Sequence, residues 1–287
     1  MPALEAATAD FVRGLEHRKV AANGLEFAYL EEGQGQLVLL LHGFPDTAHT
    51  WDRVRPALAA RGYRAVSPFL RGYPPTSTPT DGRYDTEALA DDVVALIDAL
   101  GGGPAIVVAH DWGAGAAYAA AGKAPDRIRK LVTVALPHPA AVPPAWRVLW
   151  GARHFFTLRV PGAAKRIRAG GFAHIDELVQ RWSPGWAVPE GETAAVKRAF
   201  AEPGALEAAI GYYRAMSPIL SRSQRAKISV PTVAIAALDD GILVAGDYER
   251  ARARFTGSYR VIPMAGGHFL HRQHPEQFLD HLLDAIG

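Results

Sequence analysis

The chain has 287 residues, 49% of them hydrophobic, and a formal net charge of +2 at pH 7, which predicts one large buried core, or a core with a small second unit, and no strong attraction to nucleic acid or membranes. The absence of cysteine excludes disulfides, thiolate metal sites and cysteine nucleophiles. Residues 1–16 lack the basic-then-apolar pattern of a secretory signal, and no apolar run is long enough to span a membrane, so we expect a cytoplasmic protein.

Strands and helices alternate through the first half of the chain. Apolar runs bounded by glycine and proline predict strands at 20–31, 37–41, 64–69, 105–109 and 131–135. Helical spacing of apolar residues predicts helices at 50–61, 85–100 and 114–123. This alternation predicts an α/β fold with a mostly parallel, doubly wound sheet.

The pattern changes after residue 137. Helical patterns at 146–157, 175–182, 193–201 and 205–216 follow without a convincing strand, and then strands at 232–237 and 259–263 precede a helix at 275–286. We therefore predict a core of residues 1–137 and 223–287 with a helical cap, or lid, inserted at 138–222. The cap would lie over the carboxyl ends of the strands, where open α/β sheets bind ligands, and its tryptophans would help to form an apolar pocket.

Asp111 is the first candidate for chemistry. It follows the buried run 105–109 and precedes an alanine-rich helical stretch, with the small residues Ala109 and Gly113 two positions to either side. Small residues are needed there because a sharp strand-to-helix turn brings neighbouring backbone close. Such a turn displays its central side chain above the sheet, as in a nucleophile elbow. The displayed group here is a carboxylate.

Two later strand ends carry partners for this carboxylate. Asp239 and Asp240 follow the strand at 232–237, and His268 follows the strand at 259–263. Taken singly, each has an ordinary structural explanation, such as a helix cap or a packed histidine. The order nucleophile, acid, histidine at three successive strand ends instead indicates a covalent-catalysis set.

The chain resembles the α/β-hydrolase superfamily, and specifically its epoxide hydrolases. Four segments carry the resemblance, namely His42-Gly43-Phe44-Pro45, His110-Asp111-Trp112-Gly113-Ala114-Gly115, Pro137-His138-Pro139 and Gly267-His268-Phe269. The resemblance implies an α/β-hydrolase fold with Asp111 as nucleophile, His268 as base and Asp240 as its acid partner, with Asp239 as the alternative acid. It also implies an oxyanion hole formed by the backbone N–H groups of Phe44 and Trp112.

The same resemblance implies two proton donors in the cap, usually tyrosines. The segment at 208–215 resembles the one that carries the first donor, and helical geometry selects Tyr213 because it shares a face with Leu206 and Ile210, whereas Tyr212 does not. The second donor position falls on His154, whereas tyrosine is commoner at this position. Histidine paired with tyrosine occurs in some relatives. We expect the substrate pocket to include Phe44, Trp112 and Trp150.

The expected function is hydrolysis of a small apolar epoxide by water to a vicinal diol, through a hydroxyalkyl ester of Asp111. No cofactor and no metal are expected, nor a nucleic-acid or membrane partner, and the protein would be a monomer or homodimer. A metal site of His268, His271 and His274 is disfavoured because glycines and a proline around them indicate a loop.

Other functions remain as alternatives. A haloalkane dehalogenase would use the same aspartate, with Trp112 as a halide donor, although Phe44 stands where such enzymes commonly carry asparagine. A receptor-like or scaffold protein could keep the fold without catalysis. Serine hydrolysis is disfavoured because no Gly-x-Ser-x-Gly occurs, and dinucleotide binding is disfavoured because Tyr118 occupies the third glycine position.

Overall fold

The computed structural model describes residues 17–143, 146–151, 153–217 and 219–287. Its centre is an eight-stranded sheet in the order β1-β2-β4-β3-β5-β6-β7-β8, in which β1 and β2 pair antiparallel, β2 and β4 pair antiparallel, and all other pairs are parallel. The strands are β1 (Arg18–Ala22), β2 (Leu25–Glu32), β3 (Gln36–Leu41), β4 (Tyr63–Pro68), β5 (Ala105–His110), β6 (Ile128–Val134), β7 (Thr232–Ala237) and β8 (Tyr259–Met264). The predicted mostly parallel sheet is confirmed.

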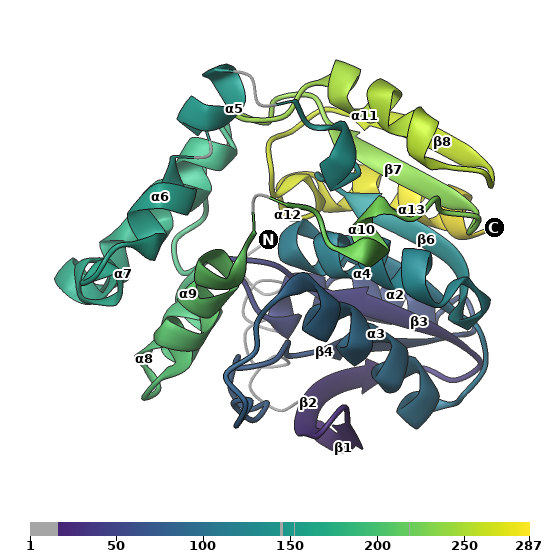
Figure 1. The fold of residues 1–287 in the computed structure, drawn as a ribbon, viewed down its shortest axis with the longest axis horizontal. Helices are drawn as coiled ribbons and strands as arrows, with labels where there is room; N and C mark the ends of the chain where they lie inside the picture. The colour runs from purple at the N-terminus through teal and green to yellow at the C-terminus, as the bar shows by residue number, and fades with distance from the viewer. Residues whose placement is uncertain (1–16, 144–145, 152, 218) are drawn as a thin grey trace.

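Helices cover both faces of this sheet (Figure 1). The core helices are α2 (Val54–Ala59), α3 (Thr86–Leu100), α4 (Asp111–Lys123), α10 (Arg222–Arg225), α11 (Ala245–Ala251), α12 (Leu270–Gln273) and α13 (Pro275–Ile286). Side chains alternate along β5: Val107 and Ala109 join the cluster with α3 and α4, whereas Ile106 and Val108 join the one with α2 and α13. Every residue of β5 is buried because it lies between these two layers.

Five helices that follow β6 and precede β7 in the chain form a separate layer, on the left of Figure 1. They are α5 (Trp146–Gly151), α6 (His154–Arg159), α7 (Ala163–Trp182), α8 (Ala194–Ala201) and α9 (Ala205–Ala215). Buried residues of α6 to α9, such as Leu158, Leu178, Phe200 and Ile210, belong to the same hydrophobic cluster as α3 and α4. The inserted helices and the core therefore share one continuous hydrophobic cluster.

The prediction of a single strand at 20–31 is wrong. Asn23 and Gly24 have positive φ angles of 46° and 73° and form a tight turn, so the segment folds back as the antiparallel hairpin of β1 and β2. Asn-Gly is the strongest short signal for such a hairpin, because both residues tolerate positive φ.

Several predicted helices differ in extent. The segment 50–61 is the end of a 3-10 helix, Ala48–Trp51, followed by α2, and the segment 146–157 is two short helices, α5 and α6. The helix predicted at 175–182 is the end of the longer α7, which is interrupted at Gly170, Gly171 and Phe172, where φ is positive. The helix predicted at 114–123 begins at Asp111, and the loop expected around His271 contains α12. No helix among the described residues is both long and apolar enough to cross a bilayer.

Candidate active site

Asp111 lies on a strained turn between β5 and α4. Its φ is 48°, an unusual value for a residue with a side chain and one that occurs mainly where surrounding structure enforces it. A Cβ added at Gly113 would lie 2.5 Å from the carbonyl oxygen of His42. Only glycine lets the first turn of α4 approach the end of β3 so closely, and this approach lifts the Asp111 carboxylate above the sheet.

The two carboxylate oxygens of Asp111 have different partners. Oδ1 accepts a hydrogen bond of 2.8 Å from the backbone N–H of Phe44, and Oδ2 lies 3.4 Å from Nε2 of His268. A Cβ at Gly43 would lie 2.4 Å from the carboxylate, which explains glycine before Phe44. The N–H of Trp112, which follows Asp111 at the start of α4, belongs to the first turn, whose N–H groups have no partner within the helix. Both predicted oxyanion-hole residues therefore lie beside Asp111.

Asp240, and not Asp239, lies against the histidine. Its Oδ2 is 2.9 Å from Nδ1 of His268, while its Oδ1 accepts hydrogen bonds from the N–H groups of Ile242 and Leu243 at 2.7 and 3.0 Å. Asp239 instead accepts from the N–H of Gly266 at 2.9 Å. A carboxylate can only accept, so Nδ1 of His268 carries the proton of this bond. Nε2 consequently faces Asp111.

The charges of Asp111 and Asp240 determine the protonation state of His268. Burial alone would lower the pKa of His268, but hydrogen bonds and charge attraction from Asp111 and Asp240 outweigh it and raise this pKa to about 10. Burial likewise favours the neutral form of Asp111, yet His268, His110 and the N–H of Phe44 hold the pKa of Asp111 well below its usual range. Asp111 is therefore an anion, and the ion pair persists at neutral pH.

Tyr213 of α9 lies beside this carboxylate, in an aromatic cluster. Its ring centre is 5.2 Å from that of Phe44 and 5.1 Å from that of Trp112, both edge-on. Burial and the charge of Asp111 raise the pKa of Tyr213 well above its usual value, against a hydrogen bond with Trp112. The indole N–H can only donate, so the tyrosine oxygen accepts and its own proton stays available. Tyr212 donates instead to the carbonyl of Arg71 at 2.9 Å.

His154 of α6 lies across the same space. Its ring centre is 4.5 Å from that of Trp182 and 5.8 Å from that of Tyr213, and only 5% of the residue is exposed. Burial lowers the pKa of His154 to about 3, with the cation of Arg181 contributing in the same direction. The imidazole is therefore neutral at physiological pH and has one N–H, for which the Gly151 carbonyl is a competing acceptor.

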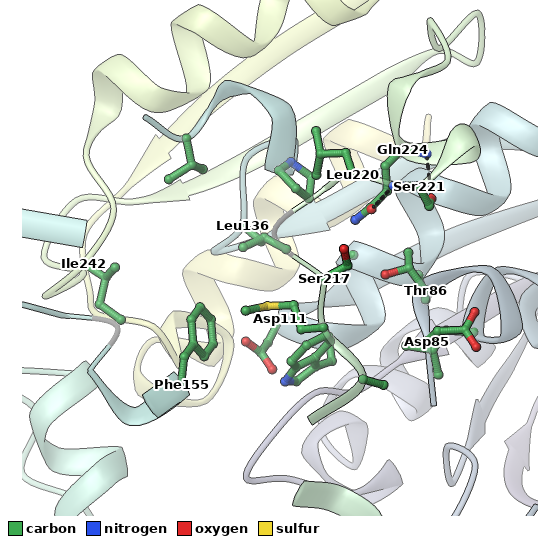
Figure 2. A pocket seen from close by; sticks show the side chains of 18 of the residues that line it. Asp85, Thr86, Asp111, Leu136, Phe155, Ser217, Leu220, Ser221, Gln224 and Ile242 are labelled. Atoms are coloured by element: carbon green, nitrogen blue, oxygen red, sulfur yellow. Dashed lines mark hydrogen bonds between the residues drawn. The ribbon is translucent and has the colours of Figure 1, made fainter. Parts of the chain in front are cut away.

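A cavity of about 320 Å³ lies between the inserted helices and the carboxyl ends of the strands. The predicted donor Tyr213 is not among its lining residues, because its ring is buried behind the wall against Phe44 and Trp112. In Figure 2, Asp111 lies between Phe155 and Ile242 on one side and Thr86 and Asp85 on the other. The cavity is lined by the predicted residues Asp111, Trp112, His154, Asp240 and His268.

Two predicted pocket residues lie elsewhere. Trp150 is 60% exposed and does not line the cavity; it stacks on Trp146 at 6.0 Å and lies under the guanidinium of Arg153. The two tryptophans are one helical turn apart, so they share a face of α5 that points away from the site. The ring of Phe44 is fully buried against Tyr213 and Phe200, and only its backbone faces Asp111.

Sequence reasoning did not assign several lining residues, including Phe155, Trp182, Leu136, Met216 and Gly115. Phe155 follows His154 directly, and Leu136 follows the predicted strand at 131–135, so adjacency could have indicated these two. Met216 and Gly115 carry no local signal. Among the described residues, no group of three or more His, Asp or Glu is arranged to hold a metal ion.

Comparisons with known proteins show the family of this chain. The family model of the alpha/beta hydrolase fold matches residues 36–275. Epoxide hydrolase A of Mycobacterium tuberculosis is 30% identical over 94% of this chain and 96% of its own length. An epoxide hydrolase of Caballeronia sordidicola is 40% identical over 45% of this chain, although the match spans only 40% of that protein's own length.

Solved structures give the same result. The crystal structure of an epoxide hydrolase from Vigna radiata superposes with a TM-score of 0.82 at 28% identity, covering 96% of this chain and 98% of the other. An inhibitor complex of a Bacillus megaterium epoxide hydrolase has a TM-score of 0.83 at 20% identity, over 94% and 99% of the two chains, which supports the fold. This chain belongs to the α/β-hydrolase fold family. Within that family, its place is among the epoxide hydrolases.

Proposed function

We propose that this protein hydrolyses an epoxide to a vicinal diol through a covalent ester on Asp111. The observation that carries the proposal is the environment of that carboxylate. It is an anion at one wall of a largely apolar cavity, with the N–H of Phe44 on one oxygen and the imidazole of His268 near the other. Its relatives among the epoxide hydrolases support the same conclusion.

The first step is ring opening. Oδ2 of Asp111 attacks one epoxide carbon, the bond from that carbon to the ring oxygen breaks, and the oxygen takes a proton from the Tyr213 hydroxyl while His154 donates a hydrogen bond. Oδ1 becomes the ester carbonyl oxygen, because it already accepts from the N–H of Phe44. The raised pKa of Tyr213 keeps its hydroxyl protonated at neutral pH, so the proton that this step needs is present.

The second step is ester hydrolysis. Alkylation removes the charge of Asp111, one of the two charges that raise the pKa of His268, so this pKa falls. The imidazolium gives up its proton, which restores the Tyr213 phenolate to the phenol, and the imidazole becomes a neutral base. Nε2 then takes a proton from water, and the resulting hydroxide adds to the ester carbonyl. Phe44 and Trp112 N–H groups stabilise the oxyanion, for which one donor is worth about 3–4 kcal/mol. The bond from the carbonyl carbon to the alkoxy oxygen breaks, and the alkoxide takes the proton from His268. The carboxylic acid left at Asp111 then passes its proton to His268, which restores the ion pair.

Diol formation from styrene oxide by the wild type and by Asp111→Asn tests the function, with halide release from a 1-haloalkane measured in parallel. We expect diol from the wild type and none from the variant. Halide release without diol formation would favour the dehalogenase alternative. Binding of epoxide without either product would favour a receptor-like protein.

A further inference from the structure

The cavity continues well beyond the reactive carboxylate. Along α4, its wall is formed by Asp111, Trp112, Gly115 and Ala116, which recur on one helical face. From Asp111 to Ala116 the helix rises about 7.5 Å, at about 1.5 Å per residue. Leu89 of α3 and, after α9, Met216 and Leu220 also line the cavity. The cavity therefore has an arm long enough for several methylene groups.

Gly115 leaves this arm open. A Cβ built on Gly115 would have no heavy atom within 4 Å, whereas one on Gly113 would clash with backbone. Gly115 does not have a positive φ, so the backbone does not require glycine. Glycine inside a helix costs roughly 1 kcal/mol relative to alanine, and nothing in the packing explains the choice. The missing side chain leaves space between Asp111 and the far end of the arm.

The far end is polar and carries negative charge. Asp85, Thr86, Ser217 and Gln224 line it (Figure 2), and Glu87 is a further lining residue. The Oε1 atom of Gln224 accepts from the N–H of Ser221 at 3.0 Å. Two cations that do not line the cavity partly neutralise the charge of these carboxylates. Arg83 lies 3.0 Å from Asp85, and Lys123 lies 3.7 Å from Glu87. The ionised residues that line this end are thus acidic, with Arg83 donating to both oxygens of Asp85 and Ser223 donating to both oxygens of Glu87.

We propose that this arm is a subsite for an unbranched alkyl chain of an uncharged epoxide, with Gly115 setting the chain length it accepts. The inference rests on the proposed function and names its substrate class. A chain ending in a hydroxyl or ester can reach the polar end without penalty. A chain ending in a carboxylate meets like charge there.

The length of the arm is tested with Gly115→Leu, using Gly115→Ala as the matched control. Both variants improve helix propensity, so neither endangers folding. We expect Gly115→Leu to lower kcat/KM for 1,2-epoxydodecane by about tenfold or more, since each methylene excluded from an apolar site costs about three- to fourfold. The same variant leaves 1,2-epoxybutane within about twofold, and Gly115→Ala changes neither substrate by more than about threefold.

Equal losses for both substrates, or no loss for 1,2-epoxydodecane, would overturn the subsite. Wild-type turnover separates this inference from the proposed function. If the wild type hydrolyses 1,2-epoxybutane with no preference for the longer chain, the subsite is refuted and the chemistry stands. If it hydrolyses styrene oxide but neither alkyl epoxide, the subsite is refuted and the chemistry stands, whereas failure on all three epoxides refutes the proposed function and the subsite with it.

The charge preference is tested with a terminal epoxide of a twelve-carbon acid and with its methyl ester. We expect kcat/KM to favour the ester by about two- to fivefold at low salt, because exposed like charges a few ångströms apart repel weakly. Added salt narrows the difference. Preference for the free acid would refute the assignment of an uncharged chain.

Discussion

Replacing Asp240 by asparagine separates the two halves of the proposed reaction. Two backbone donors, the N–H groups of Ile242 and Leu243, bind Oδ1 of Asp240. In Asp240→Asn the amide oxygen stays against these two N–H groups, because the amide N–H₂ in that place would face two donors. The N–H₂ group then faces Nδ1 of His268 and forces the tautomer with the proton on Nε2. That tautomer cannot accept a proton from water.

The expected magnitude follows from this tautomer. The wrong tautomer costs about 10⁴ in rate in the Ser-His-Asp triad, so we expect ester hydrolysis to slow by about 10³–10⁴. Ring opening does not need a base, and Asp111 keeps its contact with the N–H of Phe44. The ester should therefore accumulate.

The assay is a rapid-mixing experiment on Asp240→Asn with styrene oxide, followed by intact-protein mass spectrometry. We expect one equivalent of adduct on the protein and a matching burst, with diol released slowly. Asp239→Asn is the matched control, because that carboxylate binds the N–H of Gly266 and does not contact His268, so no adduct should persist. Steady diol release by Asp240→Asn at the wild-type rate would refute the assigned role of Asp240.

Three further predictions follow from single contacts. Tyr213→Phe removes the proton donor and should slow adduct formation by about 10²-fold, as loss of one transition-state donor does elsewhere. Tyr212→Phe loses only its hydrogen bond to the Arg71 carbonyl, so it should lower the unfolding free energy by about 1 kcal/mol and leave the rate of adduct formation unchanged. Equal effects of the two variants on that rate would contradict the assignment of Tyr213. Because folding raises the pKa of His268 from 6.5 to about 10, the native state binds the extra proton in this range, so this stabilisation is complete below pH 6.5 and is lost as pH rises toward 10. Urea unfolding of wild type and His268→Gln should show this loss in the wild type alone; parallel pH profiles would contradict it. Gly113→Ala should destabilise by about 1–3 kcal/mol because its methyl group meets the His42 carbonyl, while Gly115→Ala should stabilise slightly in thermal melts; similar melting temperatures would refute the account of the turn.

The reactive centre was predictable because its signals are local. A buried strand followed by Asp111 with Ala109 and Gly113 at either side has few structural solutions, and the structure places Asp111 on a turn with positive φ. The later partners were predictable because parallel strands bring their carboxyl ends to one edge. The choice between Asp239 and Asp240 depends on a loop whose backbone N–H groups orient each carboxylate, and local pattern does not encode that orientation.

The pocket wall was less predictable because it depends on tertiary packing. Trp150 and Trp182 both lie in helical stretches of the same insertion, yet Trp150 is 60% exposed and Trp182 is 3% exposed. Periodicity reports which residues share a face but not which neighbour that face meets. The hairpin at Asn23 is different: the Asn-Gly signal was present, and the apolar residues on both sides concealed it.

The central claim, a covalent ester on Asp111, is tested most directly by a single turnover in H₂¹⁸O with enzyme in excess over styrene oxide. Peptide mapping then locates the label. Hydrolysis of the ester at its carbonyl puts ¹⁸O into the Asp111 carboxylate and leaves the first diol unlabelled, because the new diol oxygen comes from the protein. Label in the first diol and none in the Asp111 peptide would show direct attack of water on the epoxide and would contradict the covalent mechanism.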